Sequence, residues 1–101
     1  MSGQHADDHA CVGPVLAVGL AGEAIVDAIK DLNAGVRVVD RGAYLRVLVP
    51  RRCIVTCHAI EEHLGRRFCF PGDLEKVMVS FKGALRLSEE EAIWQFATAA
   101  Q

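Results

Sequence analysis

Three of the chain's four cysteines and two of its four histidines lie in one short segment, CIVTCHAIEEHLGRRFC. Thiolates and imidazoles are ligands that zinc prefers, so this segment contains enough sulfur and nitrogen for a metal site. The residues concerned are Cys53, Cys57, His58, His63 and Cys69. A metal site, a reactive thiol site and an ordinary strand followed by a helix are the three interpretations to compare.

The spacing of these residues argues against a metal or a redox pair. Zinc knuckles hold two cysteines in a tight turn, whereas Cys53 at the start of a strand and Cys57 at the start of a helix would lie about 12 Å apart, at roughly 3.3 Å per residue. On that helix, His58 and His63 would point about 140° apart around the axis. The C-x₃-C spacing also lacks the C-x-x-C geometry of thiol oxidoreductases. We therefore expect no metal and no cofactor.

The same segment fits an amphipathic helix. Cys57, Ile60 and Leu64 recur at i, i+3 and i+7, which places them on one buried stripe where cysteine serves as a small hydrophobic residue. His58 and the adjacent pair Glu61 and Glu62 fall largely on the solvent side. The structural interpretation is therefore favoured for the whole segment.

Catalytic motifs are otherwise missing from the sequence. It contains no G-x-S-x-G, P-loop, G-x-G-x-x-G or H-E-x-x-H pattern. The acidic pair Glu89 and Glu90 occupies adjacent positions that do not converge. A small enzyme that uses Cys57 with a histidine remains a third-ranked alternative, although nothing indicates an oxyanion hole.

Composition sets the class of protein. The chain has 101 residues, of which 51% are hydrophobic and 24% charged, so we expect one compact folded domain. A net charge of −2 provides no broad basic surface, so we do not expect nucleic acid to be a partner. The polar N-terminus lacks the apolar core of a signal peptide, and the apolar stretch 12–21 is too short to span a bilayer. We expect a cytoplasmic protein with reduced thiols and no membrane partner, monomeric when free.

The first half of the chain predicts a strand, a helix and a hairpin. A flexible tail over 1–11 is followed by a strand at 12–18, in which Pro14 indicates an edge strand or pairing that begins after the proline. A helix over 22–35 ends at Asn33 and Gly35. Strands 36–40 and 43–49 form a hairpin through Asp40-Arg41-Gly42. In the second of these strands Leu45, Val47 and Val49 share one face, and Tyr44, Arg46 and Leu48 share the other.

The second half repeats this pattern. A short strand at 53–55 leads into a helix that Thr56 caps and Gly65 ends. A strand over 76–81 turns at Lys82-Gly83 into a strand at 84–87. Ser88 and Glu91 form a capping box, which predicts a final helix containing Ile93, Trp94, Phe96 and Ala97. The order β-α-β-β-β-α-β-β-α predicts an α+β fold of two small similar halves that share a core, with mainly antiparallel sheets, over residues 12–101.

Four segments in this order resemble a known family. They are VGPVL, VVDRGAYLRV, IEEHLGRRF and DLEKVMVSFKG. The series, its spacing and the length of the chain resemble the effector (regulatory or coupling) proteins of bacterial multicomponent diiron monooxygenases. The resemblance covers roughly residues 12–96 and is closest to the effectors of toluene and related aromatic or alkene monooxygenases. The cysteines and histidines of the opening segment do not belong to that pattern.

The resemblance implies a function. Effectors of this kind contain no cofactor and bind the diiron hydroxylase component, where they affect oxygen activation, coupling, substrate access and product distribution. It thus implies a non-catalytic subunit whose partner carries out the oxidation. The main rival is a cofactor-free module that binds a small molecule or a peptide.

The resemblance also indicates where the partner would bind. The segment VMVSFKG matches a region that faces the hydroxylase in methane-type relatives, so its candidate contact residues are Val79, Ser80, Phe81, Lys82 and Gly83. Strand alternation places Val77, Val79 and Phe81 on one face, and Met78, Ser80 and Lys82 on the other. The alternative is that the first set is core and Lys82-Gly83 merely a turn.

Residue type suggests a second patch. Arg41, Tyr44 and Arg46 lie near the predicted hairpin, and arginine and tyrosine are favoured at interfaces. A solvated sheet face would explain them nearly as well.

Overall fold

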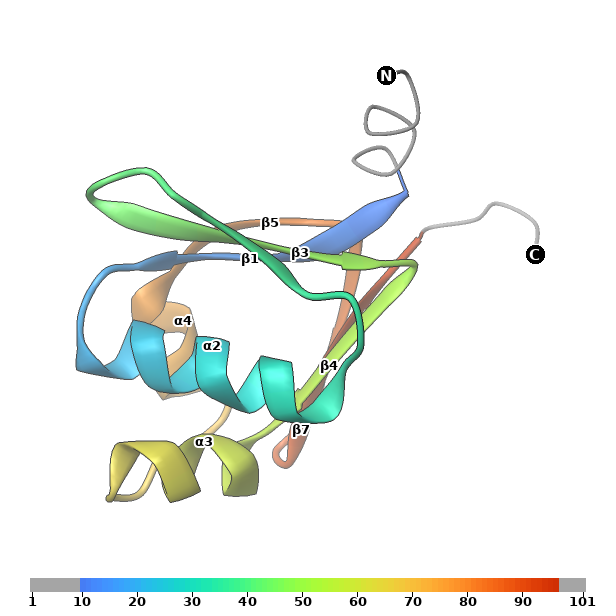
Figure 1. The fold of residues 1–101 in the computed structure, drawn as a ribbon. Helices are drawn as coiled ribbons and strands as arrows, with labels where there is room; N and C mark the ends of the chain where they lie inside the picture. Colours follow the sequence, from blue (N-terminus) through green and yellow to red (C-terminus); the bar gives the residue numbers. More distant parts are fainter. Residues whose placement is uncertain (1–9, 97–101) are drawn as a thin grey trace.

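The computed structural model describes residues 10–96, which form an α+β fold (Figure 1). The elements in chain order are β1 (Cys11–Ala17), α2 (Leu20–Leu32), β2 (Arg37–Asp40), β3 (Tyr44–Pro50), β4 (Arg52–Thr56), α3 (Cys57–Leu64), α4 (Gly72–Val77), β5 (Met78–Lys82), β6 (Ala84–Leu87) and β7 (Glu91–Gln95). Among the described residues, no helix is long and apolar enough to cross a membrane.

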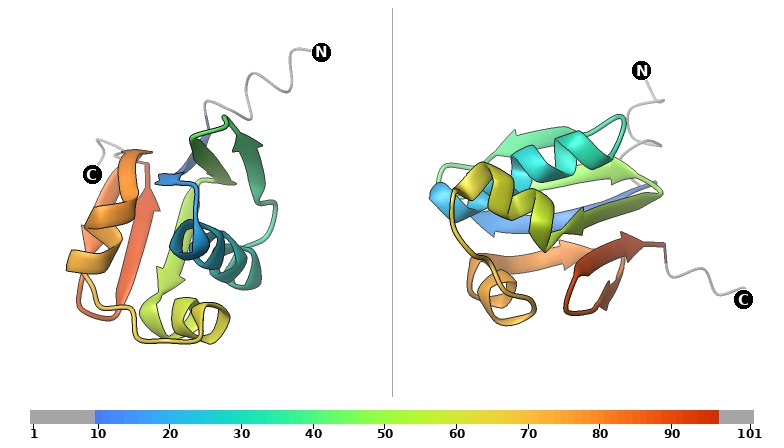
Figure 2. Two further views of the ribbon diagram at one scale, coloured as in Figure 1. Left: turned by 90° about the vertical axis from the view of Figure 1, so that its left-hand side faces the viewer. Right: turned by 90° about the horizontal axis from the view of Figure 1, so that it is seen from below.

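The strands form two antiparallel sheets, with the orders β2-β3-β1-β5 and β4-β7-β6. The sheets do not follow the two halves of the chain, because β5 from the second half pairs with β1 from the first. Helix α2 lies beneath the four-stranded sheet and contacts α3 and β4 (Figures 1 and 2). The opposite face of that sheet carries no described helix.

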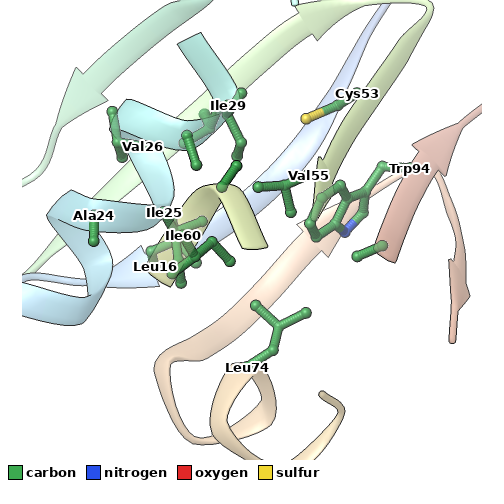
Figure 3. Close-up of a cluster of buried hydrophobic side chains, with 14 of the residues drawn as sticks. Leu16, Ala24, Ile25, Val26, Ile29, Cys53, Val55, Ile60, Leu74 and Trp94 are labelled. Atoms are coloured by element: carbon green, nitrogen blue, oxygen red, sulfur yellow. The ribbon is translucent and has the colours of Figure 1, made fainter. Parts of the chain in front are cut away.

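One hydrophobic core fills the space between the helices and the sheets (Figure 3). Ile25 and Ile29 of α2, Leu16 of β1 and Trp94 of β7 are all fully buried there. The halves therefore do share a core, as expected. The protein's single tryptophan, Trp94, lies within it and is a built-in reporter of folding.

Local signals in the sequence predicted several elements correctly. The Asp40 carboxylate accepts the Gly42 N–H at 2.8 Å in the β2–β3 turn, where Gly42 has φ +87°. Thr56 Oγ1 accepts the Ala59 N–H at 3.1 Å and caps α3. Gly65 ends α3 in the left-handed conformation, with φ +82°. The hairpin and helix α3 are thus confirmed.

The predicted final helix is wrong, because residues 91–95 form strand β7. Ser88 Oγ does accept the Glu91 N–H, at 3.2 Å, but this bond closes the β6–β7 turn, in which the Ser88 N–H donates to the Glu91 C=O at 2.9 Å. The following residues alternate as a strand, with Ala92 and Trp94 buried. Ala97 lies outside the described residues.

Two further expectations need correction. Residues 72–77 form helix α4, which the sequence did not predict, so the strand expected over 76–81 begins only at Met78. Strand β1 is central rather than at an edge, and its pairing with β3 begins at Cys11, before the proline. Pro14, which has no N–H, is tolerated because no β3 partner is assigned to Gly13 or Pro14, and the pairing with β3 resumes at Val15. Of the predicted tail over 1–11, residues 1–9 lie outside the described range and Cys11 is already in β1.

The side chain of Asn33 joins α2 to an edge strand. Its Nδ2 donates to the Ile29 and Ile54 carbonyls, each at 2.8 Å, and its Oδ1 accepts the Ile54 N–H at 3.0 Å. Strand β4 is an edge strand with β7 on its other side. The amide of Asn33 therefore supplies the hydrogen bonds that a neighbouring strand would give to Ile54.

We predict that Asn33→Ala lowers the free energy of unfolding by about 2 kcal/mol, because it leaves two partly buried backbone groups of Ile54 without partners. Urea unfolding followed by Trp94 fluorescence measures this. Lys30→Ala, an exposed change on the same helix, is the matched control. Equal stability of the two variants would contradict this account of Asn33.

Candidate functional site

The cysteine- and histidine-rich segment is divided among separate environments. Cys53 is buried and Cys69 exposed. His58 Nε2 lies 3.1 Å from the Glu62 carboxylate on α3, whereas His63 Nε2 lies 2.6 Å from the Asp31 carboxylate on α2. Within residues 10–96, no three cysteine, histidine or acidic side chains are grouped as metal ligands would be.

Cys57 has the surroundings of a structural thiol. Its Sγ lies 3.4 Å from the carbonyl oxygens of Glu89 and Glu90 and can donate to both. Partial burial, followed by the Glu61 carboxylate, raises the pKa of this thiol. Burial raises the pKa of Cys53 to about 12. Because a nucleophilic cysteine needs a lowered pKa, both environments oppose the catalytic alternative.

The uncovered face of the four-stranded sheet contains an open groove of about 730 Å³. Its floor is β1, where Gly13 and Val15 face outward. The pairing places Val15 opposite both Arg46 of β3 and Ser80 of β5, and Gly13 opposite Lys82. The residues that line the groove are Gly13, Val15, Arg41, Tyr44, Arg46, Val47, Leu48, Val79, Ser80, Phe81 and Lys82.

The structure thus joins the two patches that the sequence suggested separately. The hairpin residues Arg41, Tyr44 and Arg46 and the β5 residues 79–82 line one groove because β1 lies between β3 and β5. The sequence reasoning missed Gly13 and Val15, because it expected β1 either at an edge or paired only after Pro14, and it also missed Val47 and Leu48. Gly13 has φ +148°, and a Cβ there would meet the Val47 carbonyl oxygen at 2.4 Å, so only glycine fits.

An irregularity in β5 changes which residues face outward. The pairing with β1 shifts between Ser80 and Met78, so Val79 is an extra residue, as in a β-bulge. Met78 turns toward the core, whereas Val79 and Phe81 are 60% and 43% exposed. The predicted alternation is therefore wrong at Met78. The alternative assignment of Val79 and Phe81 to the core is also wrong.

Gly83 forms the corner at which the chain leaves the first sheet for the second. It has φ +103°, and a Cβ there would meet Val12 Cγ1 at 2.8 Å and the Gln95 carbonyl oxygen at 3.0 Å. The expected turn at Lys82-Gly83 is confirmed. Gly83 itself does not line the groove, and its place in the partner-binding set remains a prediction.

The groove has a positive and partly apolar lining. Arg41, Arg46 and Lys82 line it, and none of its lining residues is acidic. Arg41 and Arg46 have no carboxylate within salt-bridge distance in the described part of the chain. Tyr44 and Phe81 each expose 43% of their surface beside these charges. Cationic and aromatic side chains on a rigid sheet are typical of a surface that binds another protein.

The fold and the groove define a small α+β binding domain with an uncovered sheet face. Comparison with known proteins identifies the family to which this domain belongs. The sequence profile of the MmoB/DmpM family matches residues 10–95. The chain belongs to this family.

One relative supports the assignment by its sequence, and one solved structure has a similar fold. The chain is 38% identical over 91 residues to the effector subunit of the alkene monooxygenase system of Xanthobacter autotrophicus (strain ATCC BAA-1158 / Py2), an alignment covering 88% of this chain and 89% of the relative. The fold of the present chain is similar to that of a chain in the structure of the phenol hydroxylase–regulatory protein complex. That match has a TM-score of 0.74 and 16% identity, and covers 85% of this chain and 97% of the other.

We predict that only Cys69 reacts quickly with a thiol reagent in the folded protein, because it is the one exposed cysteine of the four. Mass spectrometry after brief exposure to iodoacetamide at pH 8 measures the labelling. Cys69→Ser removes the fast reaction and Cys57→Ser leaves it unchanged. Rapid labelling of Cys57 would contradict the structural role given to it.

We predict that the pKa of His63 lies above its ordinary value of 6.5, chiefly because of the hydrogen bond to Asp31. Asp31→Asn lowers the pKa of His63, as measured by NMR titration, and Asp27→Asn, which removes only a more distant charge, lowers it less. Because the pKa of His63 is raised in the folded protein, its interaction with Asp31 stabilises the fold fully below pH 6.5. This stabilisation is lost as the pH rises through the pKa that His63 has in the folded protein. An unchanged pKa in Asp31→Asn would contradict the assignment.

Proposed function

We propose that this protein is a non-catalytic effector subunit that binds the hydroxylase component of a multicomponent monooxygenase and regulates it. Membership of the MmoB/DmpM family, together with 38% identity to a protein named as an alkene monooxygenase effector subunit, carries this conclusion. The raised pKa values of Cys53 and Cys57 oppose a catalytic role for these two thiols.

The groove over β1 is the proposed docking surface. It is rigid, because each of the strands that form it is hydrogen-bonded in one sheet. It presents Arg41 and Arg46 without carboxylate partners among the described residues, next to exposed Tyr44 and Phe81. A partner surface with carboxylates around apolar side chains would complement it in charge and in polarity.

Regulation by binding requires a difference in affinity. An effector that bound every conformation of the hydroxylase equally could not shift the population among them. The effector must therefore contact a part of the hydroxylase that differs between its conformations. Oxygen activation and substrate oxidation then take place at the diiron centre that the family resemblance implies for the hydroxylase, and an alkene or aromatic hydrocarbon is the proposed substrate class. The proposed compartment is the cytoplasm, where the four thiols stay reduced.

We predict that adding this chain to the hydroxylase encoded with it, together with the electron-transfer components, raises product formation per NADH consumed, and that the effect saturates near one effector per active site. Steady-state product formation during the titration measures this. If the folded chain changes neither the rate, the coupling nor the product distribution, the effector assignment is wrong. Screening the isolated chain for ligands would then test the rival hypothesis, a module that binds a small molecule or a peptide.

A charge-reversal pair tests the docking surface in the same assay. Arg46→Glu is expected to raise the half-saturating concentration about tenfold, because it places a like charge against an acidic partner surface. Lys30→Glu makes the same change in net charge on the exposed side of α2, away from the groove, and is expected to have little effect. Equal responses of the two variants would show that net charge, and not this groove, governs binding.

A further inference from the structure

Two apolar side chains on the uncovered face of the four-stranded sheet are shielded from water. Cys11 of β1 and Leu48 of β3 each expose only 4% of their surface, yet neither is part of the hydrophobic cluster between the helices and the sheets. Their neighbours Val12 and Val49 do belong to that cluster, so strand alternation turns Cys11 and Leu48 outward. Tyr44, at the other end of the same outward face of β3, is 43% exposed. Packing in the core therefore does not account for the burial of Cys11 and Leu48.

This buried end of the groove is where the described part of the chain begins. Ala10 directly precedes β1, and its carbonyl accepts the Arg51 N–H at 2.8 Å, which fixes the point at which the N-terminal segment (residues 1–9) joins the sheet. A residue two or three positions before Ala10 lies no farther than about 10 Å from it, at roughly 3.3 Å per residue. The covalent chain alone thus keeps this part of the segment near Cys11.

The charges at this end of the groove are opposite to those of the N-terminal segment. Lys82 lines the groove on the β5 side, and Arg37 pairs with Leu48 on the β2 side, so a cation stands on either side of the buried side chains. No acidic residue lines the groove. The segment, MSGQHADDH, contains Asp7 and Asp8 and no lysine or arginine. Its charge therefore complements that of the groove where the two adjoin.

We propose that the N-terminal segment lies across this end of the groove, with Asp7 and Asp8 against its two cations, and that the hydroxylase displaces the segment when it docks. The competition rests on the proposed function, whereas the contact between segment and groove does not. Because the segment is part of the same chain, its effective concentration at the groove is high at any protein concentration. Surface ion pairs are weak, so the covered state lowers the apparent affinity for the partner without preventing binding.

The reactivity of Cys11 tests the contact in the absence of the hydroxylase. In a Cys69→Ser background, which removes the exposed thiol, the joint change Asp7→Asn and Asp8→Asn is expected to raise the rate of iodoacetamide labelling of Cys11 about fivefold, because two weak surface ion pairs are lost. Mass spectrometry of peptides measures the rate. Cys53, which is fully buried in the core, reports unfolding in the same sample and should react as slowly as in the parent protein.

Two further variants separate this contact from a general effect of charge. Glu89→Gln with Glu90→Gln removes two adjacent carboxylates from the β6–β7 turn of the other sheet, and should leave the labelling of Cys11 unchanged. Lys82→Met keeps an unbranched apolar side chain and removes the charge. It is expected to speed the labelling of Cys11 by about twofold, because one of the two cations remains.

The hydroxylase titration tests the competition. The fraction of protein with an uncovered groove governs both the reactivity of Cys11 and the apparent affinity for the hydroxylase. The variant with Asp7→Asn and Asp8→Asn is therefore expected to reach half-saturation at about one fifth of the parent's concentration, with the same maximal stimulation. A higher half-saturating concentration than that of the parent would show that the segment contributes to docking, and the competition would be wrong.

The remaining outcomes separate the contact from the proposed function. If the aspartate changes leave the labelling of Cys11 unchanged, the segment does not cover the groove and the proposal is wrong. If Cys11 is protected only at high protein concentration, or only with phosphatidylglycerol vesicles, a second copy or a membrane is the cover and the proposal is also wrong. If the labelling rises as expected but the parent protein does not stimulate the hydroxylase, the contact stands, and the effector function and the competition fail.

Discussion

The rest of the structure depends on the central position of strand β1, which is hydrogen-bonded to β3 on one side and to β5 on the other. One face of this strand packs in the core, and the other forms the floor of the groove. Val12 and Leu16 point into the core and are fully buried, whereas Gly13 and Val15 form the floor of the groove. The hairpin on one side and β5 on the other reach a common surface only through this strand. The same seven residues thus contribute one face to the core and the other face to the proposed docking surface.

The crossing at Gly83 holds the two sheets in one body. The chain leaves β5, which pairs with β1, and enters β6, which pairs with β7, within a single residue. Close contact with Val12 and with the Gln95 backbone leaves no room for a side chain. The position of β5, and with it one wall of the groove, is therefore coupled to the packing of the second sheet. A substitution that changes that packing would therefore move one wall of the proposed docking surface even if the substituted residue does not contact the partner.

Elements defined by nearby residues were predictable from the sequence, and those defined by distant pairing were not. Thr56, Gly65 and the Asp40 turn act within a few residues, so α3 and the hairpin were predicted. Ser88 and Glu91 make the same hydrogen bond in a tight turn as in a helix cap, so only the pairing with β4 and β6 decides that β7 is a strand. The central place of β1 and the bulge at Val79 likewise depend on strands far away in the chain. For the site, residue types identified its walls, while the floor and the union of the two patches required the sheet order.

The alternation along β1 has a consequence for how such a protein can evolve. Substitutions at residues 15 and 17 alter the outward face, whereas residue 13 has room only for glycine, and substitutions at residues 12, 14 and 16 alter the core. An insertion or deletion of one residue would exchange the two sets, placing valine and leucine in water and the groove floor in the interior. Single outward side chains of β1 can therefore be replaced without exchanging the two faces, whereas a change in the length of this strand would exchange them. A change in length is better accommodated in the turn that joins β1 to α2, which belongs to neither face.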